Sequence, residues 1–157
     1  MPAVNNEGVS ARKSAITGSL ALLLVGAGRA AQRRIEDALA TDGLTLRHLG
    51  ALSHLSRRPD LSYSDLARRA GVTAPSMHAT VRQLQDLGVV AGVGTGQGQR
   101  ARLEVTPQGH ELLAGVAERL HGIDEELLEG LPEEHREHVK AFLAGVVPGS
   151  TGIGDER

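Results

Sequence analysis

The sequence contains no cysteine and almost no aromatic residues. With no cysteine among 157 residues, disulfides, thiolate zinc sites and cysteine redox sensing are excluded. Tyr63 and Phe142 are the only aromatic side chains, so the core must be built from leucine, valine and alanine, and recognition of bases by aromatic stacking is not expected. The hydrophobic fraction of 40% is sufficient for a core, and the length suits one compact domain or one subunit of an intertwined dimer.

Long apolar runs are also missing, and the uncharged segment near the start is short. Residues 14–28 carry no charge and follow two basic residues, which resembles a signal peptide. The segment is shorter than the ~20 residues of a membrane span. Its leucines and alanines continue at helical spacing as far as Leu39. One amphipathic helix from about Ser19 to Ala40 explains both halves, so we expect no membrane segment and a cytoplasmic protein.

The pattern G-x-G-x-x-A occurs in this segment, from Gly26 to Ala31. In dinucleotide-binding folds such glycines let a pyrophosphate approach a helix N-terminus. Those folds place an acidic residue ~20 positions further on, where this chain has Thr45 to His48, and alternating strands and helices do not follow. Small residues at a close helix crossing explain the glycines better. Motifs of serine hydrolases and zinc proteases are absent too, so we expect neither an enzyme nor a cofactor.

Charge is distributed unevenly along the chain, although the net charge is only −2. From Ser64 to Arg102 there are five arginines against two aspartates, whereas from Glu111 to Glu137 acidic residues dominate. A basic middle beside an acidic end indicates either that one face meets an anion or that both are ordinary solvated surfaces. Metal binding is a further alternative, since His135 and His138 are spaced i, i+3 and His121 has acidic neighbours, but exposed residues at this spacing are usually plain surface and we expect no metal.

Caps and turn residues divide the chain into helices and one hairpin. The expected helices follow Ser19, Thr45, Ser64, Thr73 and Thr106, and a last helix carries Val139 to Val146; a short strand is expected at 61–63, and a hairpin at 89–93 and 101–105, joined by a glycine-rich loop. Helix, tight turn, helix and hairpin is the order of a winged helix-turn-helix. Ala67 is small where the two helices must cross, and Gly71 supplies the turn. We therefore predict a mainly α fold with a small β-hairpin wing.

The second helix of this motif carries the candidate DNA-binding residues. Its apolar side should face inward through Met77, Val81, Leu84 and Leu87. The outward side then carries Pro75, Ala79, Arg82 and Asp86, flanked by Ser76, His78 and Gln83. Ser76 and His78 can donate or accept hydrogen bonds, and Arg82 could pair with guanine or hold a phosphate. Gln83 could contact adenine or the DNA backbone, and the helix N-terminus at Thr73 can bind a phosphate. In the wing, Arg100 and Arg102 could enter the minor groove or bind phosphate.

The stretch LTLRHLGALSHLSRRPDLSYSDLARRAGVTAPSMHATVRQLQDLGVV, followed by RLEVTPQGHELL, resembles the MarR family of transcription regulators. The resemblance covers residues 44–113. It implies a repressor or activator that binds a palindrome of double-stranded DNA as a homodimer. It also implies a winged helix-turn-helix lobe at 44–106, dimerisation helices at 14–43 and 107–147 within one domain at 14–147, and disordered tails at 1–13 and 148–157. Many members release DNA when a small-molecule effector binds; here such a pocket would involve Arg47, His48 and His54.

Two positions depart from the family pattern. Ala79 stands where the family often has arginine, and the usual Asp-x-Arg of the wing corresponds to Gln97 and Gln99, with Arg100 one residue later. These changes remove positive charge, and each lost phosphate contact lowers affinity for DNA. The alternative is therefore a degenerate relative that keeps the dimer as a protein-interaction module and binds DNA weakly or without specificity.

Overall fold

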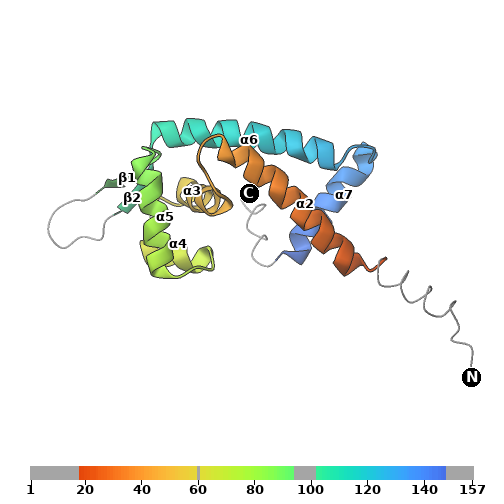
Figure 1. The fold of residues 1–157 in the computed structure, drawn as a ribbon, viewed down its shortest axis with the longest axis horizontal. Helices are drawn as coiled ribbons and strands as arrows, with labels where there is room; N and C mark the ends of the chain where they lie inside the picture. Colours follow the sequence, from red (N-terminus) through yellow and green to blue (C-terminus); the bar gives the residue numbers. More distant parts are fainter. Residues whose placement is uncertain (1–17, 60, 94–101, 148–157) are drawn as a thin grey trace, which may run out of the picture. The chain divides into compact units, whose positions relative to one another are not determined.

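The computed structural model describes residues 18–59, 61–93 and 102–147, and all structural statements concern these residues. The predicted tails and wing loop, including Gln97, Gln99 and Arg100, lie outside them. The chain divides into two compact units, one ending at Ile123 and the other beginning at Asp124. Apart from the short strand expected at 61–63, helices and strands follow each other in the predicted order (Figure 1): α2 (Leu20–Ala40), α3 (Leu46–Arg57), α4 (Tyr63–Arg69), α5 (Ala74–Asp86), β1 (Val90–Val93), β2 (Arg102–Val105), α6 (Pro107–Leu127) and α7 (Glu133–Val146).

Helix α2 is continuous through Gly26 and Gly28, so these glycines do not form a phosphate-binding turn between a strand and a helix. A Cβ atom at either glycine would meet no other atom within 4 Å. The close helix crossing expected at these glycines is therefore not found among the described residues. No described helix is long and apolar enough to cross a membrane.

Side-chain caps set where the helices of the first unit begin. Thr45 caps α3 and Thr73 caps α5, as predicted; each threonine hydroxyl accepts a hydrogen bond from the backbone N–H three residues later. The prediction for α4 was wrong. Ser62, rather than Ser64, caps this helix, because its hydroxyl accepts from the Asp65 N–H while the Asp65 carboxylate accepts from the Ser62 N–H. Tyr63 consequently lies in the helix and not in a short strand.

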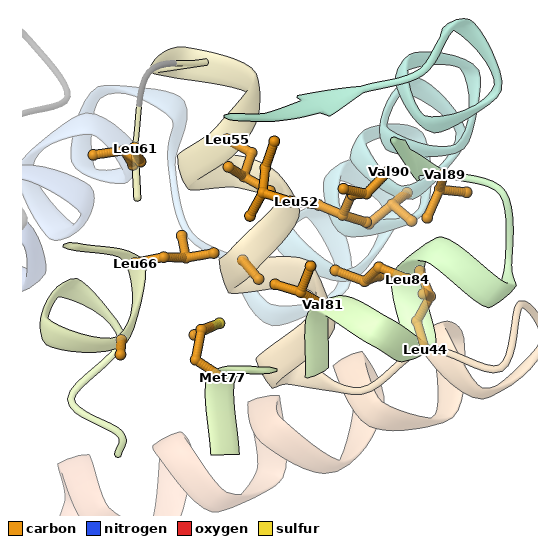
Figure 2. Close-up of a cluster of buried hydrophobic side chains, with 14 of the residues drawn as sticks. Leu44, Leu52, Leu55, Leu61, Leu66, Met77, Val81, Leu84, Val89 and Val90 are labelled. Carbon is orange, nitrogen blue, oxygen red and sulfur yellow. The ribbon is translucent and has the colours of Figure 1, made fainter. Parts of the chain in front are cut away.

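The core of the first unit is aliphatic. Figure 2 shows leucines, valines and Met77 of α3, α4, α5 and the hairpin converging on one cluster. Of the four side chains expected to face inward from α5, three are completely buried: Met77, Val81 and Leu84. The fourth, Leu87, is 39% exposed, so that prediction was wrong. The helix ends at Asp86 and the chain turns at Gly88, whose φ of +72° favours glycine, before Leu87 can reach the core.

The two-stranded wing is antiparallel, with Val90 opposite Val105 and Val93 opposite Arg102. Its base is fixed to the start of α6 through Thr106. The Thr106 N–H donates to the Val89 carbonyl at 3.1 Å, and the Thr106 hydroxyl donates to the Gly88 carbonyl at 2.8 Å. The same hydroxyl accepts from the Gly109 N–H at 3.1 Å. Gly109 is buried against the Val89 backbone and Val105 of β2, so the hairpin and the long helix are joined without room for a side chain.

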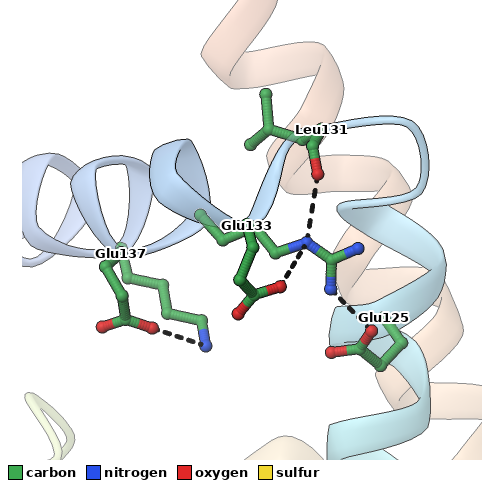
Figure 3. A network of polar contacts seen from close by, with 6 residues as sticks. Glu125, Leu131, Glu133 and Glu137 are labelled. Atoms are coloured by element: carbon green, nitrogen blue, oxygen red, sulfur yellow. Dashed lines mark hydrogen bonds and ion pairs between the residues drawn. The ribbon is translucent and has the colours of Figure 1, made fainter.

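The second unit contains the end of α6, a turn at Gly130 and helix α7. The guanidinium of Arg136 donates from Nη1 to Glu125 at 2.7 Å and from Nε to the Leu131 carbonyl at 3.2 Å, and it forms an ion pair with Glu133. Figure 3 shows Glu125, Leu131 and Glu133 around this network. The hydrogen bond with Glu125 raises the pKa of Arg136. This network closes the turn between the two helices, while α7 itself has no buried residue.

Candidate nucleic-acid interface

Helix α5 is the element on which most candidate residues lie. Its N-terminus is formed by Thr73, whose hydroxyl accepts from the Ser76 N–H at 3.4 Å, with Pro75 in the first turn where its missing N–H costs little. Opposite the buried side, six candidate side chains are exposed: Thr73, Pro75, His78, Ala79, Arg82 and Gln83. Ser76 is half-buried. One face of the helix thus combines an exposed N-terminus, hydrogen-bonding side chains and one cation.

His78 is stacked on Tyr63 of α4. Their ring centroids are 4.1 Å apart, and the planes differ by 15°. Stacking covers one face of the imidazole and leaves its nitrogen-bearing edge for other contacts. Sequence reasoning missed Tyr63 because it assigned that residue to a strand. The spacing of Ser62 and Asp65, typical of a capping box, would have placed Tyr63 in the first turn of the helix.

Gln83 contacts a buried histidine of α3. The Nε2 atom of His48 lies 2.8 Å from the Gln83 side-chain oxygen, and His48 is only 7% exposed. The two residues are 35 positions apart in the chain. No local pattern indicates such a contact, so sequence reasoning missed His48 as a partner of α5.

In the wing, the structure describes one of the two candidate arginines. Arg102 is exposed at the start of β2, and its neighbour Leu103 is buried in the core. Because successive side chains of a strand point to opposite sides, Leu103 packs into the core while Arg102 remains accessible to solvent. Arg100 lies outside the described residues.

The described residues of the first unit form several open pockets. One, of about 240 Å³, lies between α3 and α6; its lining residues are Leu49, Ser53, Ser56, Arg57, Leu113, Val116, Ala117 and Leu120. Another, of about 330 Å³, is lined by Asp42, Leu87, Val89, Gln108, Glu111 and Leu112. A larger one, of about 570 Å³, is lined in part by Arg47, His48 and Gln83. The effector pocket expected from the family resemblance stays a prediction: Arg47 and His48 line the largest of these pockets, whereas Arg57 is the charged residue of the pocket between α3 and α6. Among the described residues, no group of three or more histidine and acidic side chains could hold a metal ion.

Comparison with known proteins shows to which family this chain is related. The sequence pattern of the MarR family matches residues 42–101. The transcriptional repressor Rv2887 of Mycobacterium tuberculosis is 32% identical over 127 residues, which span 79% of this chain and 90% of the repressor. The chain belongs to the MarR family. The crystal structure of Rv2887 with DNA has a TM-score of 0.70 and 29% identity over 82% of this chain and 98% of that one.

The MarR relationship confirms the predicted winged helix-turn-helix class. A second crystal structure of Rv2887, in complex with p-aminosalicylic acid, has a TM-score of 0.67 and 29% identity over 82% of this chain and 98% of that one. The MarR relatives are named as transcriptional repressors and not as enzymes, in agreement with the expectation from the sequence.

Proposed function

We propose that this protein is a sequence-specific DNA-binding repressor that acts as a homodimer on a palindromic operator in the cytoplasm. Helix α5 is the observation that carries the proposal. Its apolar side is locked in the core, whereas its N-terminus and the side with Arg82 are exposed. A helix held in this way can lie in a major groove and present its N-terminal half to base edges. The complex of Rv2887 with DNA supports the same class of partner.

The proposed contacts follow from the chemistry of each position. The N–H groups at Thr73 would bind a phosphate, Ser76 and His78 would face base edges, and Arg82 would pair with guanine or hold a phosphate. Arg102 would approach the DNA backbone or the minor groove from the wing. The full proposed site is Thr73, Pro75, Ser76, His78, Ala79, Arg82, Gln83, Arg100 and Arg102.

The dimer is proposed from exposed apolar side chains at both ends of the chain. In the first unit Leu20, Leu22, Leu23 and Val25 of α2 are each at least half exposed. In the second unit α7 exposes Phe142, Leu143 and Val146. Soluble monomers rarely expose contiguous apolar patches of large area. We therefore assign residues 14–43 and 107–147 to dimerisation and 44–106 to the DNA-binding lobe.

We propose that a small aromatic carboxylic acid regulates DNA binding through the pocket between α3 and α6. The apolar floor of the pocket suits an aromatic ring, and Arg57 at its edge offers a cation to a carboxylate. The complex of Rv2887 with p-aminosalicylic acid supports this ligand class.

The proposal is tested by selecting genomic DNA fragments bound by the purified protein at several salt concentrations. We expect a shared palindrome whose half-sites are about one helical turn apart. For Arg82→Ala and Arg102→Ala, the slope of log affinity against log salt should each fall by about 1 where the arginine holds a phosphate. Lys140→Ala is the matched control, because Lys140 is an exposed cation on α7 outside the proposed site. p-Aminosalicylate added to the same assay should weaken binding.

Failure to enrich any sequence, with weak binding only at low salt, would reject the repressor and favour the protein-interaction module. A sedimentation measurement that finds only monomers at micromolar concentration would reject the assigned dimer. Equal loss of salt dependence in all three variants would show that Arg82 and Arg102 act only through overall charge.

A further inference from the structure

We infer that His48 is a positioning residue for DNA binding: it holds the Gln83 amide so that its N–H groups face outward and donate to a DNA phosphate. The inference rests on the proposed function and deepens it. The sequence alone leaves two roles open for Gln83, which are a contact with adenine and a contact with the DNA backbone. The hydrogen bonds around His48 decide between these two roles.

The hydrogen bonds of His48 indicate which ring nitrogen carries the N–H. His48 is the third residue of α3, and its Nδ1 atom lies 3.1 Å from the Thr45 backbone nitrogen, which donates to it. Nδ1 therefore carries the lone pair. A neutral imidazole bears one N–H, so the proton is on Nε2. This N–H points at the Gln83 oxygen, 2.8 Å away, and donates to it.

The bond to His48 fixes which end of the Gln83 amide is available. Its oxygen is engaged on the inner side, and its nitrogen makes no hydrogen bond that the structure describes. A bidentate contact with adenine needs an amide oxygen that accepts from N6 and an amide nitrogen that donates to N7. With the oxygen engaged, Gln83 presents donors alone, which suit a phosphate oxygen.

The place of Gln83 along α5 supports the same role. It is the tenth of thirteen residues in a helix that begins at Ala74. Recognition helices read bases mainly from their N-terminal half, and side chains nearer the C-terminus meet the DNA backbone. Because the buried His48 ring belongs to α3, the orientation of this amide is set by the core of the lobe and is present before DNA arrives.

A matched pair of substitutions separates the hydrogen bond that His48 donates to Gln83 from the bond by which His48 caps the start of α3. His48→Gln and His48→Glu both keep an oxygen at the third helical position, where glutamine and glutamate accept from the N-cap N–H. Glutamine retains a donor for the Gln83 oxygen, whereas glutamate has none and would turn the amide nitrogen inward. We would measure affinity for the selected operator with each variant, alone and combined with Gln83→Ala, and confirm folding by thermal melting.

Gln83→Ala should lower affinity about two- to tenfold on every sequence, with base preferences unchanged. His48→Gln should bind nearly as the natural protein does. His48→Glu should weaken binding strongly when Gln83 is present and only slightly when it is alanine, because His48 acts through Gln83. Equal losses in both backgrounds would overturn the inference. So would loss of an adenine preference at one base position in Gln83→Ala.

Nitrogen NMR of the free protein tests the positioning without DNA. We expect the His48 ring to be protonated on Nε2, with slow exchange of that proton and faster exchange in Gln83→Ala. Protonation on Nδ1 would overturn the inference. If the natural protein selects no operator, the proposed function fails and the NMR result alone decides whether His48 orients Gln83.

Discussion

A single added methyl group at Gly109 should separate the wing from the long helix α6. A Cβ atom built on Gly109 would lie 2.3 Å from the Val89 carbonyl oxygen and 2.7 Å from a methyl of Val105. Real Cβ contacts under 3.0 Å are essentially absent, so α6 or the backbone at Val89 must shift by about 0.7 Å. The obstacle is backbone that also accepts the Thr106 N–H, so no side-chain rotation can relieve it.

The expected cost of Gly109→Ala follows from this overpacking. Inserting a methyl into a packed site typically costs about 1–3 kcal/mol. For a chain of this length that corresponds to a fall in melting temperature of about 2–12 °C. We would measure it by thermal and urea unfolding at one fixed protein concentration, since the stability of a dimer depends on concentration. Operator affinity should fall too, because the base of the wing moves relative to α5.

Gly115→Ala is the matched control on the same helix. Its Cβ would meet only the end of the Arg119 side chain, at 3.9 Å. Alanine is a better helix former than glycine, so this variant should gain up to about 1 kcal/mol. A melting temperature for Gly109→Ala at or above that of the natural protein would refute the argument. An equal fall in both variants would show that any substitution of a glycine in α6 lowers the melting temperature, and that the contact with the Val89 carbonyl is not the cause.

Two further predictions concern ionisable groups of the first unit. Arg119 forms an ion pair with Asp42, and its Nε atom is buried without a hydrogen-bond partner among the described residues. Asp42→Asn leaves the Arg119 cation without its counter-charge, whereas Arg119→Met removes both the charge and the unpaired Nε atom. Asp42→Asn should therefore lower the free energy of unfolding more than Arg119→Met. Equal losses in urea unfolding would contradict this. Burial and the nearby arginines, Arg69 foremost, lower the pKa of His54 below 6.5. The unfolded chain then binds a proton first, so the free energy of unfolding should fall as the pH drops below 6.5, and less steeply in His54→Gln; identical pH profiles would contradict it.

Much of the fold could be predicted from the sequence, because it depends on interactions between residues close together in the chain. The caps at Thr45 and Thr73, the turn at Gly71 and the spacing of Met77, Val81 and Leu84 act within a few residues, so they are readable in the order of the chain. They were enough to predict the helix-turn-helix, the hairpin and the exposed side of α5. The misplacement at Tyr63 was also local, because the capping pair of Ser62 and Asp65 was overlooked.

The tertiary structure decided the contacts between distant residues. The hydrogen bond of His48 to Gln83 joins positions 35 apart, and the ion pair of Arg119 with Asp42 joins positions 77 apart. Tyr63 meets His78 only because α4 crosses α5. Such pairs depend on how helices pack around a shared core, and packing depends on the volumes of many side chains at once. The sequence alone thus identified which side of α5 is exposed, whereas only the packed structure indicates how Gln83 is oriented.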